Sequence, residues 1–225
     1  MSRRSQALSI RAAQPHDARA IASVLCAAFV EYECCYTPQA YAATTPSTED
    51  VERRFKEGPI WVALLDEAVV GTVSAVPRGK ALYVRSMAVV PEARGQSIGG
   101  ALLGHVEGYA VNHNYAYLIL STTPFLAEAI RLYESWGFRP SEEGPAELFG
   151  TPLLTMTKPL PRVRRVPGRL RGTPRREQWP EGKIDHKSAR TSHDIRARDI
   201  PPIKSGSDDH EEPGKGEGAH DDAFE

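Results

Sequence analysis

The feature that most constrains this chain is a glycine-rich turn, "VVPEARGQSIGGALL" at residues 89–103, where an apolar run gives way to a helical pattern. Glycine weakens a helix by about 1 kcal/mol relative to alanine, so Gly99 and Gly100 are costly unless something must approach the backbone closely. The first amides of a helix have no partner within it, and the helix dipole makes that end partly positive. The turn therefore favours a phosphate group, with Arg94 as a mobile cation. The alternative is that the glycines only allow close packing of the helix on a sheet.

Two common phosphate-binding motifs do not fit this turn. A Walker loop needs a lysine directly after its last glycine, and no lysine follows these glycines. A Rossmann fingerprint needs G-x-G-x-x-G in an opening strand–helix–strand unit, and the spacing here is different. A nucleotide-binding protein is therefore the weakest of the alternatives that the turn leaves open.

The periodicity of residues 1–160 predicts one α/β domain. A strand is expected at 8–13, a helix over 15–32, and two short helices follow, the second starting near Ser47 with Ser47 or Thr48 as its cap. Three strands at 60–66, 68–76 and 81–90 are separated by hairpin-length turns and predict an antiparallel meander. A helix from Ser97 to His113, a strand at 116–121, a helix over 124–136 and a final strand or pair at 148–157 complete the pattern.

Composition changes sharply near residue 160. Residues 162–176 hold seven arginines and no acid, whereas residues 208–225 hold eight acids and one lysine. Such polar sequence buries too little apolar surface to offset the entropy of ordering, so 161–225 is expected to be a disordered, charged tail. The net charge of −1 predicts no nucleic-acid ligand for the folded domain, which leaves the basic start of the tail as the one segment suited to nucleic acid.

The cysteine pattern and the absence of targeting segments predict a cytoplasmic protein. Three cysteines, with Cys34 and Cys35 adjacent, make neither a disulfide framework nor a metal-binding spacing. The basic N-terminus lacks an apolar stretch of signal-peptide length, and no run of about 18 apolar residues predicts a membrane span. We therefore expect no metal and no membrane association.

Two motifs together identify a family. The pattern P-x-x-R-G-x-x-I-G occupies 91–99, and A-I-x-L-Y-x-x-x-G-F occupies 129–138 after the intervening strand. With these, the chain resembles the GCN5-related N-acetyltransferase (GNAT) superfamily over roughly residues 8–158. The resemblance implies a mixed, mostly antiparallel central sheet flanked by helices, and acetyl-CoA as the co-substrate.

The resemblance also implies roles for particular residues. The family signature Q/R-x-x-G-x-G/A falls on Arg94, Ser97 and Gly99. Backbone amides at the turn would hold the CoA pyrophosphate, and those residues are Arg94, Gly95, Gln96, Ser97, Ile98, Gly99 and Gly100. The preceding strand would pair with the pantetheine arm through Met87, Ala88, Val89 and Val90, where an amide can polarise the thioester carbonyl. Tyr133 would act as the general acid for the leaving thiolate.

The chain departs from the family pattern at three positions. Ser97 replaces the middle glycine of the signature, and Leu126 replaces a frequent asparagine, whose contact Thr122 or Thr123 would have to supply. Arg85 stands where many members have a glutamate, so the usual base is missing. The replacement bases considered are Glu31, Glu33, Glu92 and ordered water. The acceptor site is expected to include Glu31, Tyr32 and Arg85, with Tyr36 and Tyr41 nearby, although packing would equally explain the tyrosines.

The function predicted from these features is transfer of an acetyl group from acetyl-CoA to an amine. Because no cysteine lies in the site motifs, direct attack in a ternary complex is expected, rather than an acetyl-cysteine intermediate. The acceptor is expected to be a small molecule, with a peptide N-terminus or a lysine as the other possibility. The alternative, motivated by Arg85, is an acyl-CoA-binding sensor or interaction module with little turnover.

Overall fold

The computed structural model describes residues 7–161 of the chain. The expectation of a disordered tail concerns residues 161–225, which lie outside the described part apart from residue 161. Within residues 7–161, no helix combines the length and the apolar character needed to cross a membrane.

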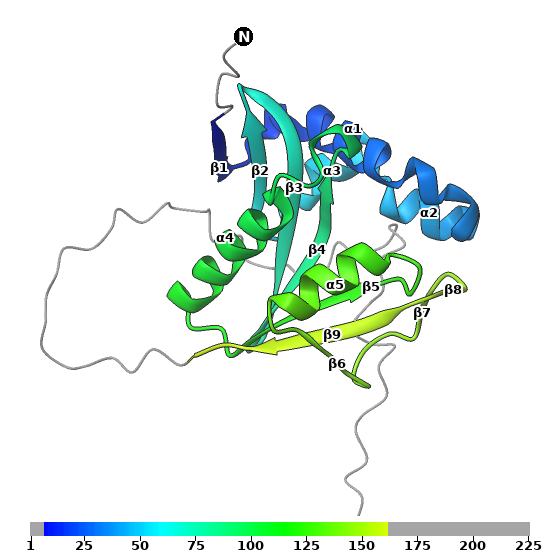
Figure 1. Cartoon of the computed structure of the whole chain (residues 1–225), viewed down its shortest axis with the longest axis vertical. Helices are drawn as coiled ribbons and strands as arrows, with labels where there is room; N and C mark the ends of the chain where they lie inside the picture. The colour runs from blue at the N-terminus through cyan, green and yellow to red at the C-terminus, as the bar shows by residue number, and fades with distance from the viewer. Residues whose placement is uncertain (1–6, 162–225) are drawn as a thin grey trace, which may run out of the picture. The chain divides into compact units, whose positions relative to one another are not determined.

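A seven-stranded mixed sheet forms the centre of the fold, in the strand order β1-β2-β3-β4-β5-β9-β6 (Figure 1). Only β4 and β5 pair in parallel, and every other neighbouring pair in this sheet is antiparallel. The strands are β1 (Leu8–Ala12), β2 (Ile60–Leu65), β3 (Ala68–Arg78), β4 (Ala81–Val89), β5 (Tyr117–Thr122), β6 (Arg139–Pro140) and β9 (Leu154–Pro159). A separate two-stranded hairpin consists of β7 (Glu147–Leu148) and β8 (Thr151–Pro152). The expected meander and the mostly antiparallel sheet are thus confirmed.

Helices cover both faces of the sheet. The α-helices are α1 (Ala18–Phe29), α2 (Pro38–Thr44), α3 (Thr48–Arg54), α4 (Ile98–Asn112) and α5 (Ala127–Ser135). The 3₁₀ segments are η1 (Pro15–Asp17), η2 (Val30–Cys35) and η3 (Pro91–Ala93). Helices α1 and α3 pack on one face, and α4 and α5 pack on the other (Figure 1).

Strand β2 shows why the sheet is buried on both faces. Trp61 and Ala63 belong to the core beneath α4, whereas Ile60 and Val62 belong to the core beneath α1. Successive side chains of a strand point to opposite faces, so a continuous apolar run fills both cores at once.

A bulge in β4 exchanges the faces to which its side chains point. The pairs Thr72↔Ala88 and Ser74↔Arg85 leave one extra residue on β4, and Ser86 in this segment has a φ of 50°. An extra residue in one strand inverts the alternation that follows it. Leu82 therefore packs beneath α4, whereas Ala88 packs beneath α1 although both numbers are even.

The start predicted for the helix over 124–136 needs a correction. Pro124 is expected at the first helical position, but α5 begins three residues later, at Ala127. The backbone first forms a turn in which the amide of Leu126 donates to the carbonyl of Thr123 at 3.1 Å. In this turn the ring of Phe125 packs edge-on against Tyr36, with 4.9 Å between centroids.

The expected cap at Ser47 is confirmed for α3. Ser47 accepts a hydrogen bond from the amide of Asp50, and Asp50 caps the Ser47 amide in return.

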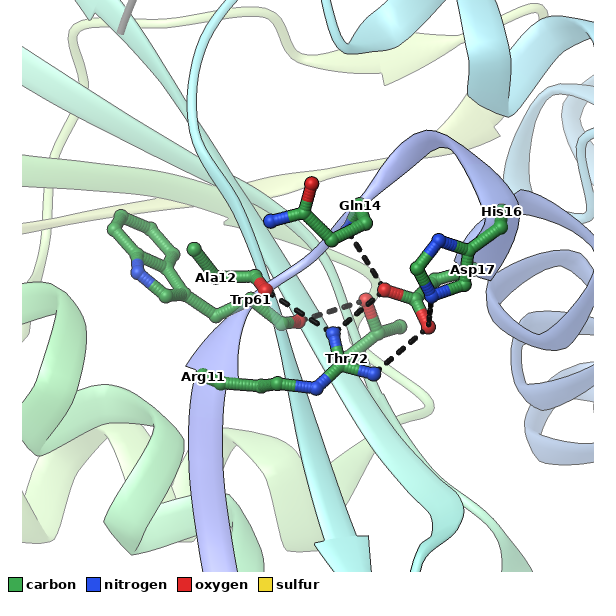
Figure 2. A network of polar contacts seen from close by, with 7 residues as sticks. All are labelled: Arg11, Ala12, Gln14, His16, Asp17, Trp61 and Thr72. Carbon is green, nitrogen blue, oxygen red and sulfur yellow. Dashed lines mark hydrogen bonds and ion pairs between the residues drawn. The ribbon is translucent and has the colours of Figure 1, made fainter. Parts of the chain in front are cut away.

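The helix expected over 15–32 is shorter than predicted, because 3₁₀ segments η1 and η2 replace its two ends. Asp17 makes no side-chain cap on α1. It accepts two hydrogen bonds from Arg11, at 2.7 and 2.9 Å, and one from the amide of Gln14 at 2.7 Å (Figure 2). This network joins β1 to α1. The bonds from Arg11 are the main reason that the pKa of buried Asp17 lies below its usual value.

Candidate active site

Strands β4 and β5 separate at Val84 and Leu120, which form the last residue pair between them. Beyond this pair β4 remains attached to β3, because the amide of Val90 donates to the carbonyl of Val70 at 2.9 Å. Alternate residues of an antiparallel pair direct their backbone groups to opposite sides. The N–H and C=O of Val89 therefore point away from β3 and into the opening between β4 and β5.

The four residues expected to pair with a pantetheine arm are not equivalent. Val90 has its amide committed to β3, whereas Val89 presents a free backbone edge toward the opening. The side chain of Met87 reaches the start of α4, where its Cε lies 3.4 Å from the place of a β-carbon built on Gly99. Ala88 is buried beneath α1.

The glycine-rich turn presents six consecutive amides that make no hydrogen bond of normal geometry within residues 7–161. They belong to residues 95–100, and the first amide bonded again is that of Ala101, which donates to Ser97 at 3.0 Å. Gly95 and Ser97 adopt left-handed conformations, with φ of 77° and 61°, and Ser97 is followed directly by the right-handed start of α4. A left-handed residue next to a right-handed one turns successive amides toward one side and makes an anion-binding concavity. The backbone geometry therefore suits a pyrophosphate, and it continues the free edge of β4.

Arg94 is not the mobile cation that the sequence suggested. Its guanidinium forms an ion pair with Glu31 in η2 and donates to the carbonyl of Ala28, at the end of α1, at 3.0 Å. This pair places the carboxylate of Glu31 beside the glycine-rich turn, where a cation already occupies it. Glu33 and Glu92, the other carboxylates considered, are both exposed.

The glycines at the start of α4 pack against α5. A β-carbon on Gly99 would lie 3.0 Å from Leu132 Cδ2, and one on Gly100 would lie 3.4 Å from Trp136 Nε1. The first distance is short enough that the neighbour would have to move. Gly99 and Gly100 thus permit close packing mainly against a helix, with Met87 of β4 also near Gly99. The unpaired amides are a separate property of the same turn.

Tyr133 lies in the last turn of α5 with only 8% of its surface exposed. Burial raises the pKa of Tyr133 to about 12, with smaller contributions from the neighbouring hydroxyls of Tyr36 and Tyr83. Tyr83 is on β4 immediately before the last pair with β5, and Tyr36 follows η2. Tyr133 is thus close to the opening, and its phenol stays protonated at neutral pH.

An aromatic cluster lines the side of the site formed by η2 and α2. Tyr36 contacts Phe29, Tyr41 and Phe125, and Tyr32 stacks on Phe125 at 6.2 Å between centroids. The sequence predicted the three tyrosines together but missed Phe125, because it was assigned to the helix that actually starts at Ala127. Burial is the main reason that the pKa of the Tyr36 phenol is raised.

Arg85 is held by a carboxylate that the sequence gave no reason to single out. Glu57, in the loop between α3 and β2, forms an ion pair with Nη2 of Arg85. The Nε atom of Arg85 is buried and has no hydrogen-bond partner among the residues that the structure describes. Nearby, Arg54 of α3 donates to the hydroxyl of Ser86 at 2.9 Å. Glu57 could be found only from the structure, since it lies 28 residues from Arg85.

The segment after β5 supplies a buried hydroxyl. Thr123 is 3% exposed, and its Oγ1 makes no hydrogen bond of normal geometry within residues 7–161, although the hydroxyl of Tyr36 is close enough to interact with it. Leu126, where the family often has asparagine, is half-buried at the start of α5. The buried polar group nearest in sequence to that position is therefore Thr123.

The residues present fit a CoA-type ligand and show no sign of a metal site. The free edge at Val89 and the six amides of residues 95–100 together offer donors along an extended thioester and its phosphates. Among residues 7–161, no group of three or more His, Cys, Asp or Glu side chains is arranged to hold a metal ion.

Comparison with known proteins identifies the family. Residues 26–138 match the family model described as the acetyltransferase (GNAT) family, which covers half of the chain. The chain belongs to this family.

The fold agrees with solved structures. A GNAT-family acetyltransferase from Staphylococcus aureus Mu50 superposes with a TM-score of 0.59 at 18% identity, covering 69% of this chain and 100% of the other. The PaiA N-acetyltransferase of Thermoplasma acidophilum, solved with coenzyme A, gives 0.59 at 16% identity, covering 68% and 99%.

Curated relatives share sequence over part of their length. Human N-acetylaspartate synthetase is 35% identical over 113 residues, which are 48% of this chain and 37% of that protein. Human N-acetyltransferase 8B is 39% identical over 85 residues, which are 35% of this chain and 37% of that protein. This chain thus matches little more than a third of the length of these relatives.

Proposed function

We propose that this protein transfers an acetyl group from acetyl-CoA to an amine of a small molecule, by direct attack within a ternary complex. The observation that carries this proposal is the opening between β4 and β5, with six unpaired amides at one end and Tyr133 beside it. One curated relative is named N-acetyltransferase 8B and another N-acetylaspartate synthetase. The second name includes an acetylated amino acid, which supports a small amine as acceptor.

The chain's own groups would divide the binding of acetyl-CoA between them. The amides of residues 95–100 hold the pyrophosphate, and the backbone of Val89 pairs with the pantetheine arm. A fixed backbone donor in the opened part of β4 stabilises negative charge on the acetyl oxygen, and it needs no reorganisation during the reaction.

Tyr133 would be the general acid. As the nitrogen–carbon bond to the acceptor forms and the carbon–sulfur bond breaks, the nitrogen loses one proton to water and the sulfur gains one from the phenol. Because burial raises the pKa of Tyr133 to about 12, the phenol carries its proton when the reaction begins. An ordinary thiol has a pKa of about 8.5, so the phenolate left by this transfer is the stronger base and regains a proton from water, which completes the cycle.

Removal of the amine proton is assigned to water. Glu31 is paired with Arg94 and Glu57 with Arg85, so each of these carboxylates already has a cationic partner.

A direct transfer also agrees with the thiols. Cys34 and Cys35 are exposed on η2, and partial desolvation together with the neighbouring Cys34 raises the pKa of Cys35, which disfavours a thiolate nucleophile. Free, exposed thiols fit a reducing compartment, and we place the reaction in the cytoplasm.

The experiment that tests this function is a thiol-release assay on the full chain with acetyl-CoA and a panel of small amines. The proposal expects acceptor-dependent release of CoA, with equal amounts of acetylated product. Acetyl-CoA binding in calorimetry without any acceptor-dependent release would instead favour the sensor or interaction module that Arg85 suggests. Absence of acetyl-CoA binding would contradict both.

A further inference from the structure

Among residues 7–161, two buried side-chain polar atoms lack a hydrogen-bond partner, Nε of Arg85 and Oγ1 of Thr123. Arg85 directly follows the last pair of β4 with β5, Val84↔Leu120, and Thr123 lies three residues beyond that pair, after the end of β5. The hydroxyl of Tyr36 lies close enough to interact with Thr123, whereas Nε of Arg85 meets no acceptor within residues 7–161. A buried donor without an acceptor is unfavourable, so Nε of Arg85 needs an explanation.

Arg85 is held in place with part of its donor set unused. The carboxylate of Glu57 pairs with Nη2 of the guanidinium, while Nε has no acceptor among residues 7–161. A contrasting case in the same chain is Arg11, which places Nη1 and Nη2 on the two oxygens of Asp17 and also donates to the Ala12 carbonyl (Figure 2). Arg11 thus completes a planar pair with a carboxylate, whereas Arg85 has a donor left over at the candidate site.

The guanidinium of Arg85 suits a planar anion. Its ion pair with Glu57 occupies Nη2 and leaves Nε without an acceptor among residues 7–161. A carboxylate matches the planar fork of a guanidinium, whereas a doubly charged phosphate would place a larger negative charge against Glu57.

We infer that Arg85 determines acceptor specificity by binding a carboxylate of the acceptor, so that the substrate class is an amine that also carries a carboxylate, such as an amino acid. This inference rests on the proposed function, because it assigns the acceptor half of the same site. Glu57 is then a positioning residue that fixes the guanidinium, and the arginine at the usual base position has a binding role.

The test compares each acceptor with a partner that differs only in the carboxylate. Aspartate, glutamate, alanine and phenylalanine are assayed beside their C-terminal amides, with the full chain and saturating acetyl-CoA, by thiol release. At least one acid is expected to exceed its amide in kcat/KM by about tenfold or more. The substitution Arg85→Gln should remove that preference, and Arg85→Lys, which keeps the charge but loses the fork, should retain only part of it.

A matched control and a binding measurement keep the outcomes separate. Arg11→Lys alters an arginine–carboxylate pair remote from the site and should leave the preference for acids unchanged. Calorimetry should give the same acetyl-CoA affinity for Arg85→Gln as for the unaltered chain. The amino acids and amides are also titrated directly, with CoA present, so that carboxylate recognition is read even without turnover.

The two proposals fail in different ways. Acids and amides used or bound equally well would overturn the role of Arg85 and leave the acetyltransferase intact. A preference for acids that persists in Arg85→Gln would also overturn it. Loss of acetyl-CoA binding in the unaltered chain would overturn the proposed function, whereas Arg85-dependent binding of an amino acid in that case would still support the carboxylate site.

Discussion

Arg94 of the glycine-rich turn forms an ion pair with Glu31 of η2, although 63 residues separate them in the sequence. The pair lies beside six amides that have no partner within residues 7–161. A carboxylate therefore neutralises the one arginine of the turn at the place proposed for a pyrophosphate. A bound pyrophosphate and Glu31 would compete for this guanidinium, and η2 would respond, because it also carries Tyr32 of the aromatic cluster.

This competition for Arg94 predicts that a substitution in the binding site strengthens the binding of acetyl-CoA. Glu31→Gln should strengthen acetyl-CoA binding by several-fold, because Arg94 is released and a negative charge is removed from the phosphate turn. Calorimetry on the full chain measures this directly. Glu128→Gln, which removes an exposed carboxylate from the first turn of α5, serves as the control and should leave the affinity unchanged. Weaker binding by Glu31→Gln would show that Glu31 supports the site.

Ser97 stores backbone strain that glycine would relieve. A left-handed conformation costs a residue with a β-carbon about 1 kcal/mol, and Ser97 has a φ of 61°. Ser97→Gly should therefore raise the melting temperature or leave it unchanged while acetyl-CoA binding persists. Ser97→Ala keeps the strain and loses the hydroxyl. A fall in affinity confined to Ser97→Ala would assign the hydroxyl to the phosphate, and loss of binding in Ser97→Gly would contradict this account of the turn.

The packing role of Gly99 can be separated from a role in binding. Gly99→Ala should lower stability, because the new methyl group would lie 3.0 Å from Leu132 Cδ2. The double substitution Gly99→Ala with Leu132→Ala should recover part of the loss, as a double-mutant cycle in unfolding would show. The double variant should bind acetyl-CoA as tightly as the unaltered chain does, since alanine keeps the backbone amide. Stability without recovered affinity would mean that the ligand itself needs the glycine.

The pKa of Tyr133 predicts the alkaline behaviour of the enzyme. Because burial raises this pKa to about 12, ionisation of Tyr133 should cause no loss of kcat between pH 9 and pH 11. An unfolded tyrosine ionises near pH 10, so the contribution of this group to stability is complete below that pH and is lost as the pH rises toward 12. Tyr133→Phe should lower kcat at least about tenfold with unchanged acetyl-CoA affinity. An unchanged kcat would remove its role as general acid.

The lowered pKa of Asp17 predicts how the free energy of unfolding falls at acidic pH. Its pKa is lowered chiefly by the hydrogen bonds from Arg11, so its stabilising contribution is complete above the ordinary aspartate pKa and is lost as the pH falls through the lowered value. Asp17→Asn should reduce the free energy of unfolding by about 2 kcal/mol at pH 7. Urea unfolding at pH 7 and at pH 3 should show this difference shrinking at the lower pH. A difference that stays constant would contradict the electrostatic explanation.

Local patterns in the sequence were sufficient to predict most of the fold. The cap at Ser47, the meander from 60 to 90 and the helix beginning near residue 98 all follow from side-chain periodicity and helix-capping chemistry. The start of α5 was predicted wrongly because Thr123-Pro124 is a good local start signal, and a tertiary contact between Phe125 and Tyr36 overrides it.

The site was less accessible from the sequence because its decisive contacts are long-range. The bulge at Ser86 leaves no mark in "ALYVRSMAVV", which is apolar enough to continue as a regular strand. The partners of Arg85 and Arg94 come from elements 28 and 63 residues away, and one charge among many carries no pairing signal. The glycines of α4 suggested a ligand, yet their nearest neighbours are side chains of α5.

We propose that the opening beyond Val84 and the unpaired amides of residues 95–100 form a CoA site. Calorimetric titration of the full chain with acetyl-CoA, with ATP and NADH as controls, tests this assignment. We expect saturable binding of acetyl-CoA with a stoichiometry of about one per chain and much weaker binding of both controls. Equal affinity for all three ligands, or no binding of acetyl-CoA, would contradict the assignment.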